Sequence, residues 1–269
     1  MNGPAMPSIP SLILGLVQGL TEFLPVSSSG HLVLVSHLLH YDSPGLVLET
    51  VVHLATTLVV LIYFRRRLWE ILSGIQKDWP ARRLLLMLAL AFGVTALVGL
   101  LISPWIPAAF DSPGLSGAML LVTSAILLSI RFLRPEVAGN SLWQVSWKVA
   151  LIVGLAQGIA ILPGISRSGI TIVVALWAGQ SRTSAAEYSF LLAIPTLLAA
   201  SAFSFLQDPQ ISGADARDIA AAAAVAFASG FLAVHWLMRW LERGRLWWFS
   251  GYCAVAGAGS LVLWAWPGA

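Results

Sequence analysis

Long apolar stretches separated by short polar segments make up most of the chain. A helix that crosses the hydrocarbon core of a bilayer needs about 20 mostly apolar residues. Six stretches meet that length, and they cover approximately residues 45–64, 83–103, 115–132, 185–206, 217–241 and 246–266. The pattern therefore predicts an all-α integral membrane protein with six transmembrane helices.

Two further apolar regions, 8–40 and 145–179, are each interrupted by a break rich in Pro, Ser and Gly. The first break, at 24–30, reads LPVSSSG, and the second, at 162–169, reads LPGISRSG. The apolar segments on either side of a break are about 10–17 residues long, which suits a re-entrant hairpin better than a span. We therefore expect two re-entrant helical hairpins in addition to the six spans.

The composition agrees with a membrane protein. Hydrophobic residues make up 58% of the 269 positions and charged residues only 10%, whereas a soluble domain carries about 25% charged residues. This composition excludes a soluble globular protein and a disordered chain. The net charge of +3 comes from loop cations and not from a basic face, so we expect no nucleic-acid partner. No polar stretch is long enough for a soluble domain, and residues 1–269 are predicted to form a single membrane domain.

The cations predict the orientation of the chain. If six spans alternate, one side receives most of the cations, namely Arg65, Arg66, Arg67, Lys77, Arg82, Arg83, Arg131, Arg134, Lys148, Arg182, Arg239, Arg243 and Arg245. The other side receives Asp42, Asp111, Asp208, Asp215 and Asp218, with Arg217 as its single cation. The positive side is expected to be cytoplasmic. Arg167 remains, and no loop accounts for it because it lies inside the second break.

The two broken regions are related by an internal repeat. Six residues of the first region recur 139 positions later: Gly15, Gln18, Gly19, Ser27, Ser29 and Gly30 match Gly154, Gln157, Gly158, Ser166, Ser168 and Gly169. The orientation rule brings the two regions in from opposite faces, as in an inverted-topology repeat. We expect repeat halves at about 8–134 and 145–266, although chance similarity between two Gly/Ser-rich breaks is the alternative.

The two halves differ in their charged residues. Glu22 and His31 occur only in the first half, and Arg167 occurs only in the second, where their counterparts are uncharged. A purely structural repeat has no reason to divide charge in this way. The division favours a single site assembled from both halves.

One helix face in the first half combines glycines with polar residues. Gly15, Gln18, Gly19 and Glu22 are spaced i, i+3, i+4 and i+7 and therefore share a face. Glycines on a face allow another backbone to approach closely, so the polar members should point into the protein. A carboxylate at this depth needs a partner or a function. The alternative is a glycine-packed helix contact in which Glu22 is merely satisfied.

The breaks also predict an anion site. Each ends in Ser-x-Ser-Gly before a short apolar helix, and a helix start offers free N–H groups and a positive dipole. Arg167 adds a guanidinium that binds phosphate oxygens in pairs. The candidate hydroxyl donors of this site are Ser27, Ser28, Ser166, Ser168 and Thr171. Some of these serines could instead serve only as helix caps, but capping does not account for Arg167.

Histidines are the candidates for proton transfer near neutral pH. His31 follows the first break and is close in sequence to Ser28 and Glu22, which favours a catalytic role over that of a hydrogen-bonded core residue. Glu49 and His53, at i and i+4 in the first span, could pair with each other. We expect these two residues to support the site from behind.

The sequence of the two breaks resembles a known family. Residues 18–31 (QGLTEFLPVSSSGH) and 163–171 (PGISRSGIT) are similar to the two signatures of the bacterial undecaprenyl-diphosphate phosphatases, the bacitracin-resistance family. Residues 185–195 (AAEYSFLLAIP) and the basic 65–67 are similar as well, so the resemblance covers essentially the whole chain. The chain departs from some members at Gln18, where they carry Glu, and a two-carboxylate metal clamp is therefore not expected.

The resemblance implies an enzyme and its chemistry. It implies hydrolysis of undecaprenyl diphosphate to undecaprenyl phosphate and phosphate, which recycles the lipid carrier of peptidoglycan synthesis and confers bacitracin resistance. It also implies a divalent cation, Mg²⁺ or Ca²⁺, for which Glu22 is the candidate ligand. In this interpretation Arg167 and the helix starts hold the diphosphate, Gln18 belongs to the binding site, and Glu22 and His31 handle the proton. The nucleophile stays open between Ser28, His31 and a water.

The resemblance also implies a location, the bacterial inner (plasma) membrane. The hairpin with Glu22 is expected to enter from outside, which predicts an outward-facing site. The oligomeric state is open, with a homodimer as a candidate. A polyprenyl-phosphate transporter or flippase is the rival function, because inverted repeats with broken helices are typical of transporters. A non-catalytic membrane scaffold is a third alternative.

Overall fold

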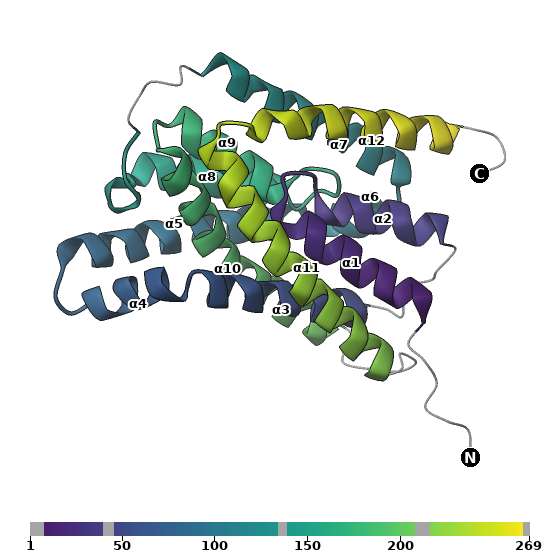
Figure 1. Ribbon diagram of the computed structural model, residues 1–269, viewed down its shortest axis with the longest axis horizontal. Helices are drawn as coiled ribbons and strands as arrows, with labels where there is room; N and C mark the ends of the chain where they lie inside the picture. Colours follow the sequence, from purple (N-terminus) through teal and green to yellow (C-terminus); the bar gives the residue numbers. More distant parts are fainter. Residues whose placement is uncertain (1–7, 40–45, 134–138, 208–215, 266–269) are drawn as a thin grey trace.

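The computed structural model describes residues 8–39, 46–133, 139–207 and 216–265 of the chain (Figure 1). These residues are helical almost throughout, and the extended pairing among them is limited to one isolated bridge between Asn140 and Gln180. The predicted all-α fold is therefore confirmed. The predicted loop residues Asp42, Arg134, Asp208 and Asp215 lie outside the described ranges.

Five helical stretches among the described residues are long and apolar enough to cross a membrane: Trp79–Phe110, Pro113–Phe132, Arg182–Leu206, Ala216–Glu242 and Leu246–Ala265. They contain α5 (Trp79–Ile102) with α6 (Ile106–Phe110), α7 (Pro113–Ser129), α10 (Arg182–Gln207), α11 (Ala216–Glu242) and α12 (Phe249–Ala265). Large apolar side chains cover their outer faces, such as Leu97 at 60% and Val255 at 75% exposure. An apolar outer surface of this kind needs lipid around it, so the chain is a multi-pass membrane protein.

A sixth span depends on how one bend is counted. Helix α3 (Leu46–Tyr63) covers the first predicted span, and α4 (Arg65–Gly74) follows it at an angle of 69°. The chain thus turns at the start of the basic segment that the sequence assigned to a loop. Five or six spans fit the structure, and the number six stays a prediction.

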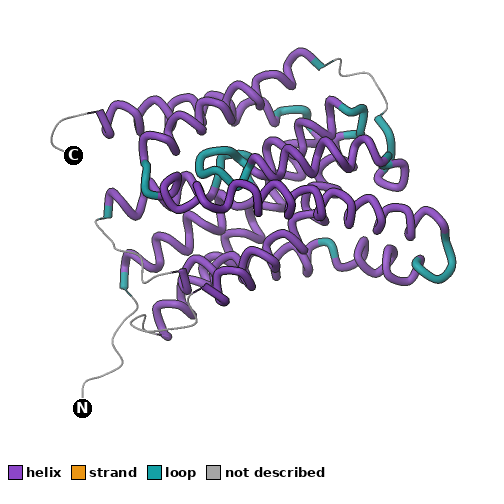
Figure 2. The backbone as a smooth tube through the Cα atoms, turned by 180° about the vertical axis from the view of Figure 1, so that it is seen from behind, coloured by secondary structure: helices purple, strands orange, loops and turns teal. Residues whose placement is uncertain are grey.

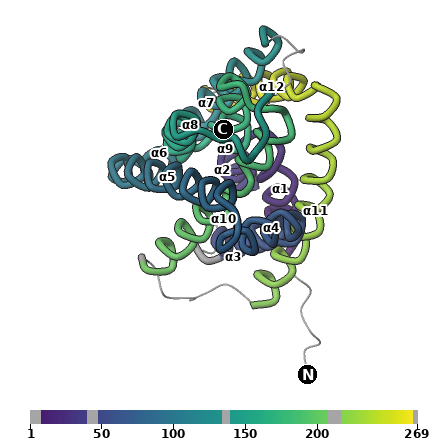
Figure 3. The backbone as a smooth tube through the Cα atoms, turned by 90° about the vertical axis from the view of Figure 1, so that its left-hand side faces the viewer, coloured from purple at the N-terminus to yellow at the C-terminus, as the bar shows by residue number. Residues whose placement is uncertain are grey.

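The two broken regions form pairs of short helices. The first pair is α1 (Ile9–Phe23, 15 residues) and α2 (Ser28–Leu38, 11 residues). The second is α8 (Trp147–Ile159, 13 residues) and α9 (Arg167–Trp177, 11 residues). Each arm is shorter than the length of about 20 residues that a span requires. Viewed from one end, α2 and α9 lie in the middle of the molecule, surrounded by the longer helices (Figure 3).

The serines of the breaks start the inner helices. Ser27 caps α2 by accepting a hydrogen bond from the N–H of Gly30, and Ser166 caps α9 by accepting one from the N–H of Gly169. Such caps satisfy backbone donors that have no partner inside the helix. The capping role that we considered for the serines therefore applies to these two. The loops between the helix arms lie deep among the helices (Figure 2).

Glycines bring the first arm of each hairpin against a long helix of the other half. Helix α1 packs on α11, where a Cβ at Gly15 would overlap the backbone of Ala222. Helix α8 packs on α5, where a Cβ at Gly154 would lie 2.6 Å from the carbonyl oxygen of Ala91. The close backbone approach predicted from the glycine face is confirmed. The repeat-related glycines also make equivalent contacts, each with an alanine of the opposite half.

The basic end of α3–α4 is tied to the second half of the chain. The Arg67 guanidinium donates to Glu187 at 3.1 Å and to Glu70 at 2.5 Å, and it lies 5.6 Å from the centre of the Trp143 ring. Arg67 and Glu187 belong to the two shorter stretches that resemble the family. Their contact joins α4 to α10 and lies apart from the breaks.

Candidate active site

A large cavity lies where the two breaks meet. Its volume is about 1240 Å³. Polar side chains from several helices reach its wall, among them Glu22 (α1), Ser28 (α2), Glu49 and His53 (α3), Gln157 (α8), Arg167 (α9), and Thr196 and Ser201 (α10). Both halves of the chain therefore supply the cavity, as the division of charge predicted.

Glu22 lies at the centre of the polar contacts. Its Oε2 accepts hydrogen bonds from Gln18 Nε2 at 2.9 Å and from Ser28 Oγ at 2.7 Å. Its Oε1 is paired with the Nη2 of Arg167 from the other half. The Nε2 of His53 is 3.7 Å from Oε2. The carboxylate is only 5% exposed, so these partners compensate for the water that it has lost.

Arg167 has one donor to spare. Its Nη2 contacts Glu22, while its Nη1 is buried and has no hydrogen-bond partner among the described residues. A buried guanidinium donor without a partner is costly unless a ligand occupies it. Because Arg167 lines the cavity, an anion in the cavity could supply the missing acceptor.

Ser27 holds the first break in an uncommon conformation. Its φ of 68° makes it the one non-glycine residue with positive φ in the described part of the chain. Such conformations are unfavourable for L-residues and are found where the surroundings hold them, often at functional sites. The next residue is Ser28, whose hydroxyl donates to Glu22. The strained turn therefore aims Ser28 at the carboxylate.

The two breaks contact each other directly. Ser27 Oγ accepts a hydrogen bond from the N–H of Gly164 at 3.1 Å, and Ser168 Oγ donates to the Leu24 carbonyl at 3.2 Å. A Cβ at Gly30 would lie 2.9 Å from the Cα of Gly164, so the approach requires glycine. These bonds connect the segments that lead into α2 and α9, the two helix starts to which the sequence assigned an anion site.

The remaining predicted binding residues divide into two groups. Ser27 and Ser166 line the cavity. Gln18, Ser168 and Thr171 are not among the residues that line the cavity. Gln18 is fully buried and donates to Glu22, but its Oε1 has no partner among the described residues. Ser168 bonds to the first break, and Thr171 bonds to Ser189 at 2.6 Å. We therefore interpret Ser168 and Thr171 as supporting residues, because their hydrogen bonds are made to protein atoms.

His31 lies behind the first break and is not among the residues that line the cavity. Its Nδ1 is 2.7 Å from the Ser27 carbonyl, and its Nε2 is 2.7 Å from the hydroxyl of Tyr252 on α12. A carbonyl only accepts, so Nδ1 carries the hydrogen, and in the neutral ring Nε2 accepts from Tyr252. Both ring nitrogens are thus engaged away from Glu22. The geometry gives no support to the role in proton transfer that the sequence suggested for His31.

His53 is the histidine that faces Glu22. It lines the cavity together with Glu49, and its Nδ1 is 2.7 Å from the Glu49 carbonyl oxygen. That bond requires a hydrogen on Nδ1, as in His31, and leaves Nε2 directed at Glu22. We predicted His53 and Glu49 as support behind the site, and the structure brings both to its wall. The i, i+4 contact between them is made by the backbone carbonyl of Glu49 and not by its carboxylate.

The side chains of Glu22 and Gln18 carry oxygens of the kind that ligate divalent cations. Gln18 Oε1 is buried and has no hydrogen-bond partner among the described residues, and it lies one helical turn from Glu22. Hard cations prefer such carbonyl and carboxylate oxygens, and Mg²⁺ takes further ligands from phosphates and water. The part of the chain that the structure describes contains no group of three or more His, Cys, Asp or Glu side chains that could hold a metal ion without further ligands.

Comparison with known proteins identifies the family. The model of the family described as "Bacitracin resistance protein BacA" matches residues 11–259. The chain belongs to the BacA family. The undecaprenyl-diphosphatase of Carboxydothermus hydrogenoformans is 41% identical over 262 residues, covering 96% of this chain and 98% of the relative. The undecaprenyl-diphosphatase of Syntrophotalea carbinolica is 40% identical, covering 92% of this chain and 95% of the relative. That of Desulfatibacillum aliphaticivorans is 38% identical, covering 93% of this chain and 96% of the relative.

Membership of the BacA family confirms the resemblance that the two break sequences indicated. The structure adds two residues that sequence reasoning did not find. Thr123 on α7 donates to the Gly164 carbonyl at 2.8 Å and accepts from the Ser166 N–H at 3.0 Å, and Tyr252 on α12 contacts His31. Both lie in ordinary apolar spans, where a single hydroxyl gives no signal in the sequence.

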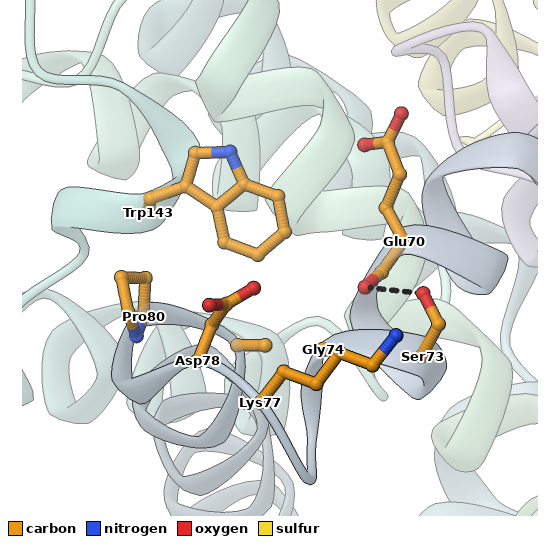
Figure 4. A pocket seen from close by; sticks show the side chains of 8 residues that line it. Glu70, Ser73, Gly74, Lys77, Asp78, Pro80 and Trp143 are labelled. Carbon is orange, nitrogen blue, oxygen red and sulfur yellow. Dashed lines mark hydrogen bonds between the residues drawn. The ribbon is translucent and has the colours of Figure 1, made fainter.

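A smaller hollow lies at the turn between α4 and α5 (Figure 4). Its volume is about 590 Å³, and its wall carries Glu70, Lys77, Asp78 and Trp143. It shares no residue with the central cavity and contains none of the predicted site residues. Its mixed charges do not select one class of ligand, so the candidate active site of this BacA family member is the central cavity.

Proposed function

We propose that the chain hydrolyses undecaprenyl diphosphate to undecaprenyl phosphate and inorganic phosphate in the central cavity. The reaction recycles the lipid carrier of cell-wall synthesis and confers resistance to bacitracin. One observation carries the proposal: Ser28, Glu22 and Arg167 form a nucleophile, a base and an anion-binding group in direct contact. Membership of a family whose relatives are named undecaprenyl-diphosphatase supports it.

Substrate binding uses the spare donor of Arg167. Its free Nη1 and the N-termini of α2 and α9 attract the diphosphate, and the guanidinium neutralises charge that develops as the phosphoryl group transfers. Thr196 and Ser201 line the same cavity, and the buried Ser201 Oγ has no hydrogen-bond partner among the described residues. The polyprenyl tail remains among the apolar helices.

Ser28 acts as the nucleophile in this proposal. As Ser28 Oγ bonds to the terminal phosphorus, its proton moves to Glu22 Oε2, 2.7 Å away. The bridging oxygen leaves with the electron pair of the broken P–O bond and takes the proton from Glu22. Glu22 then takes a proton from a water whose oxygen attacks the phosphorus of the phosphoserine. The bond between phosphorus and Ser28 Oγ breaks, Oγ takes the proton back from Glu22, and phosphate leaves. Direct attack by a water activated by Glu22 is the alternative.

Two further groups assist these steps. The Nε2 of His53 is 3.7 Å from Glu22 Oε2, so the imidazole can help to hold the carboxylate in position. Glu22 and Gln18 would hold the divalent cation that the family resemblance implies. When bound, that cation would neutralise charge on the diphosphate oxygens.

The location is part of the proposal. The wall of the cavity extends to Ser103, Pro107 and Asp111, in the connection from α5 to α7. This connection is on the side opposite the cation-rich loops. The positive-inside rule assigns the cation-rich loops to the cytoplasm and therefore this connection to the outside. We therefore propose an outward-facing site in the bacterial inner membrane. Assembly as a homodimer stays a prediction.

The test is phosphate release by the purified protein. We expect it to release phosphate from a long-chain isoprenyl diphosphate in detergent, and EDTA to lower the rate. Absence of phosphate release from a protein that retains its folded thermal transition would contradict the proposal. Uptake of the intact lipid phosphate into one leaflet of a vesicle, without hydrolysis, would instead favour a transporter.

A further inference from the structure

Tyr252 is a polar residue of the last transmembrane helix that the proposed reaction does not use. Its hydroxyl is 2.7 Å from His31 Nε2, and the two rings stack with centroids 5.5 Å apart and planes 10° apart. The two residues are 221 positions apart in the chain. Tyr252 thereby connects α12 to the hairpin that carries Glu22 and Ser28.

The contact reaches the strained turn through His31. The Nδ1–H of His31 donates to the Ser27 carbonyl at 2.7 Å, so the Tyr252 hydroxyl donates to Nε2 of the neutral ring. A hydroxyl donor on Nε2 favours the tautomer with the hydrogen on Nδ1. Removal of the Tyr252 hydroxyl would leave Nε2 without its donor and would release the ring to turn or change tautomer.

The Ser27 carbonyl belongs to the peptide that precedes Ser28. Ser27 has a φ of 68°, a conformation that persists only while neighbouring groups hold it. Its side chain accepts from the N–H groups of Gly30 and Gly164. Its carbonyl accepts from the backbone N–H of His31 at 3.2 Å and, more closely, from the Nδ1–H of the same residue at 2.7 Å. Rotation of this peptide would move the Ser28 hydroxyl away from Glu22.

A neighbouring residue of α12 supports the same turn. Cys253 Sγ donates to the carbonyl of Pro25 at 3.6 Å. Two consecutive residues of α12 thus hold two carbonyls of the first break, Cys253 directly and Tyr252 through His31. A helix that contributes no residue to the cavity wall is in this way connected to the residues beside the nucleophile.

We propose that Tyr252 is a positioning residue for the phosphatase reaction. It holds His31 so that the ring fixes the Ser27 peptide and keeps the Ser28 hydroxyl on Glu22. The proposal rests on the proposed function and adds to it a residue outside the cavity. His31 is then a positioning residue as well, because its ring joins the Tyr252 hydroxyl to the Ser27 carbonyl.

The first test is Tyr252→Phe in the purified full-length protein, with Tyr188→Phe as the matched control. We expect kcat to fall by about tenfold or more, because small displacements of a reacting group are costly. KM should stay within about twofold, since Arg167 still binds the diphosphate. The hydroxyl of the buried Tyr188 donates to the Met87 carbonyl at 2.9 Å, away from the cavity, so its loss should leave kcat unchanged.

A double-mutant cycle separates positioning from general packing. If Tyr252 acts only through His31, Tyr252→Phe should lower kcat no further in the His31→Ala background. Two effects that multiply would overturn the proposal, as would a wild-type kcat for Tyr252→Phe or a change confined to KM. If a variant has a lower Tm, its kcat is measured below that Tm and judged in the same way.

Hydrogen exchange gives a readout that does not depend on activity. Tyr252→Phe should speed amide exchange in the peptide that spans residues 24–31, while Tyr188→Phe should not. Unchanged exchange in that peptide would overturn the positioning role even if the enzyme is active. A wild-type protein that releases no phosphate would contradict the proposed function, and the exchange result would still decide whether Tyr252 holds the break.

Discussion

Arg167 and Glu22, 145 positions apart in the chain, form a largely buried ion pair between the two hairpins. Each residue has no charged counterpart in the other half of the sequence repeat. Desolvation makes such a pair a weak source of net stability, but loss of one partner leaves an uncompensated charge that costs about 3–5 kcal/mol. The pair therefore joins the halves and positions the guanidinium beside the cavity.

Arg167→Ala should abolish nearly all turnover. We expect kcat/KM to fall by about 10³-fold, because the variant loses the guanidinium that binds and neutralises the transferring phosphoryl group. Arg167→Lys should restore little, since an ammonium cannot keep Glu22 and a phosphate in a fork geometry. Phosphate release from a long-chain isoprenyl diphosphate measures both variants.

Arg131→Ala is the matched control for that prediction. Arg131 is exposed and lies over the Trp247 ring at 5.1 Å, outside the central cavity. Its loss should leave turnover unchanged. Near-normal phosphate release from folded Arg167→Ala would remove Arg167 from the site.

Ser28→Ala and Ser29→Ala should differ sharply. Ser28 Oγ donates to Glu22, whereas Ser29 Oγ makes a longer contact of 3.4 Å with Ser27 Oγ and does not reach the carboxylate. We expect Ser28→Ala to lower kcat on the order of 10³-fold or more, as loss of a nucleophile does. Ser29→Ala should stay close to wild type. Mass spectrometry of acid-quenched enzyme should detect phosphate on Ser28.

The rate of Ser28→Ala and the search for phosphoserine also decide whether Ser28 or a water is the nucleophile. If a water attacks directly, Ser28→Ala retains a sizeable rate and no phosphoserine accumulates. Inversion of configuration at the terminal phosphorus of a chirally labelled diphosphate would then support direct attack, because two successive displacements through phosphoserine retain the configuration.

His53→Ala should impair the reaction more than His235→Ala. His53 is 3.7 Å from Glu22 in the cavity, and we expect its loss to lower kcat by about ten- to a hundredfold. His235 packs at 6.4 Å from the Tyr63 ring and does not line the cavity, so its variant should behave like wild type. Equal rates for all three proteins would exclude a contribution of His53 to the reaction.

Gly19→Ala should destabilise the fold, and Gly93→Ala should not. A Cβ at Gly19 would overlap Ser229 and the Ala226 carbonyl of α11, which predicts a loss of about 1–3 kcal/mol. A Cβ at Gly93 meets no atom within 4 Å, and alanine favours the helix by about 1 kcal/mol. Thermal unfolding in detergent should therefore show a lower Tm for Gly19→Ala alone.

Several parts of the fold follow from sequence patterns because they depend on local chemistry. Apolar length predicts the spans, and Pro with Ser-x-Ser-Gly predicts where the hairpins break and where α2 and α9 begin. The spacing of Gly15, Gln18, Gly19 and Glu22 predicts a buried polar face in close contact with another backbone. The bend between α3 and α4 was not predicted, because a basic segment after a span reads as a loop until its packing is known.

The chemical character of the site was determined by the sequence, because a Glu on an apolar helix and an Arg inside a break between two apolar helices are costly to bury without a partner or a ligand. Only the tertiary structure decided which histidine faces the carboxylate. Periodicity shows which residues share a helix face, but not which neighbour that face meets. His31 turns to Tyr252 and His53 turns to Glu22 because α12 and α3 pack on different sides of the first hairpin, and such packing depends on residues far away in the chain.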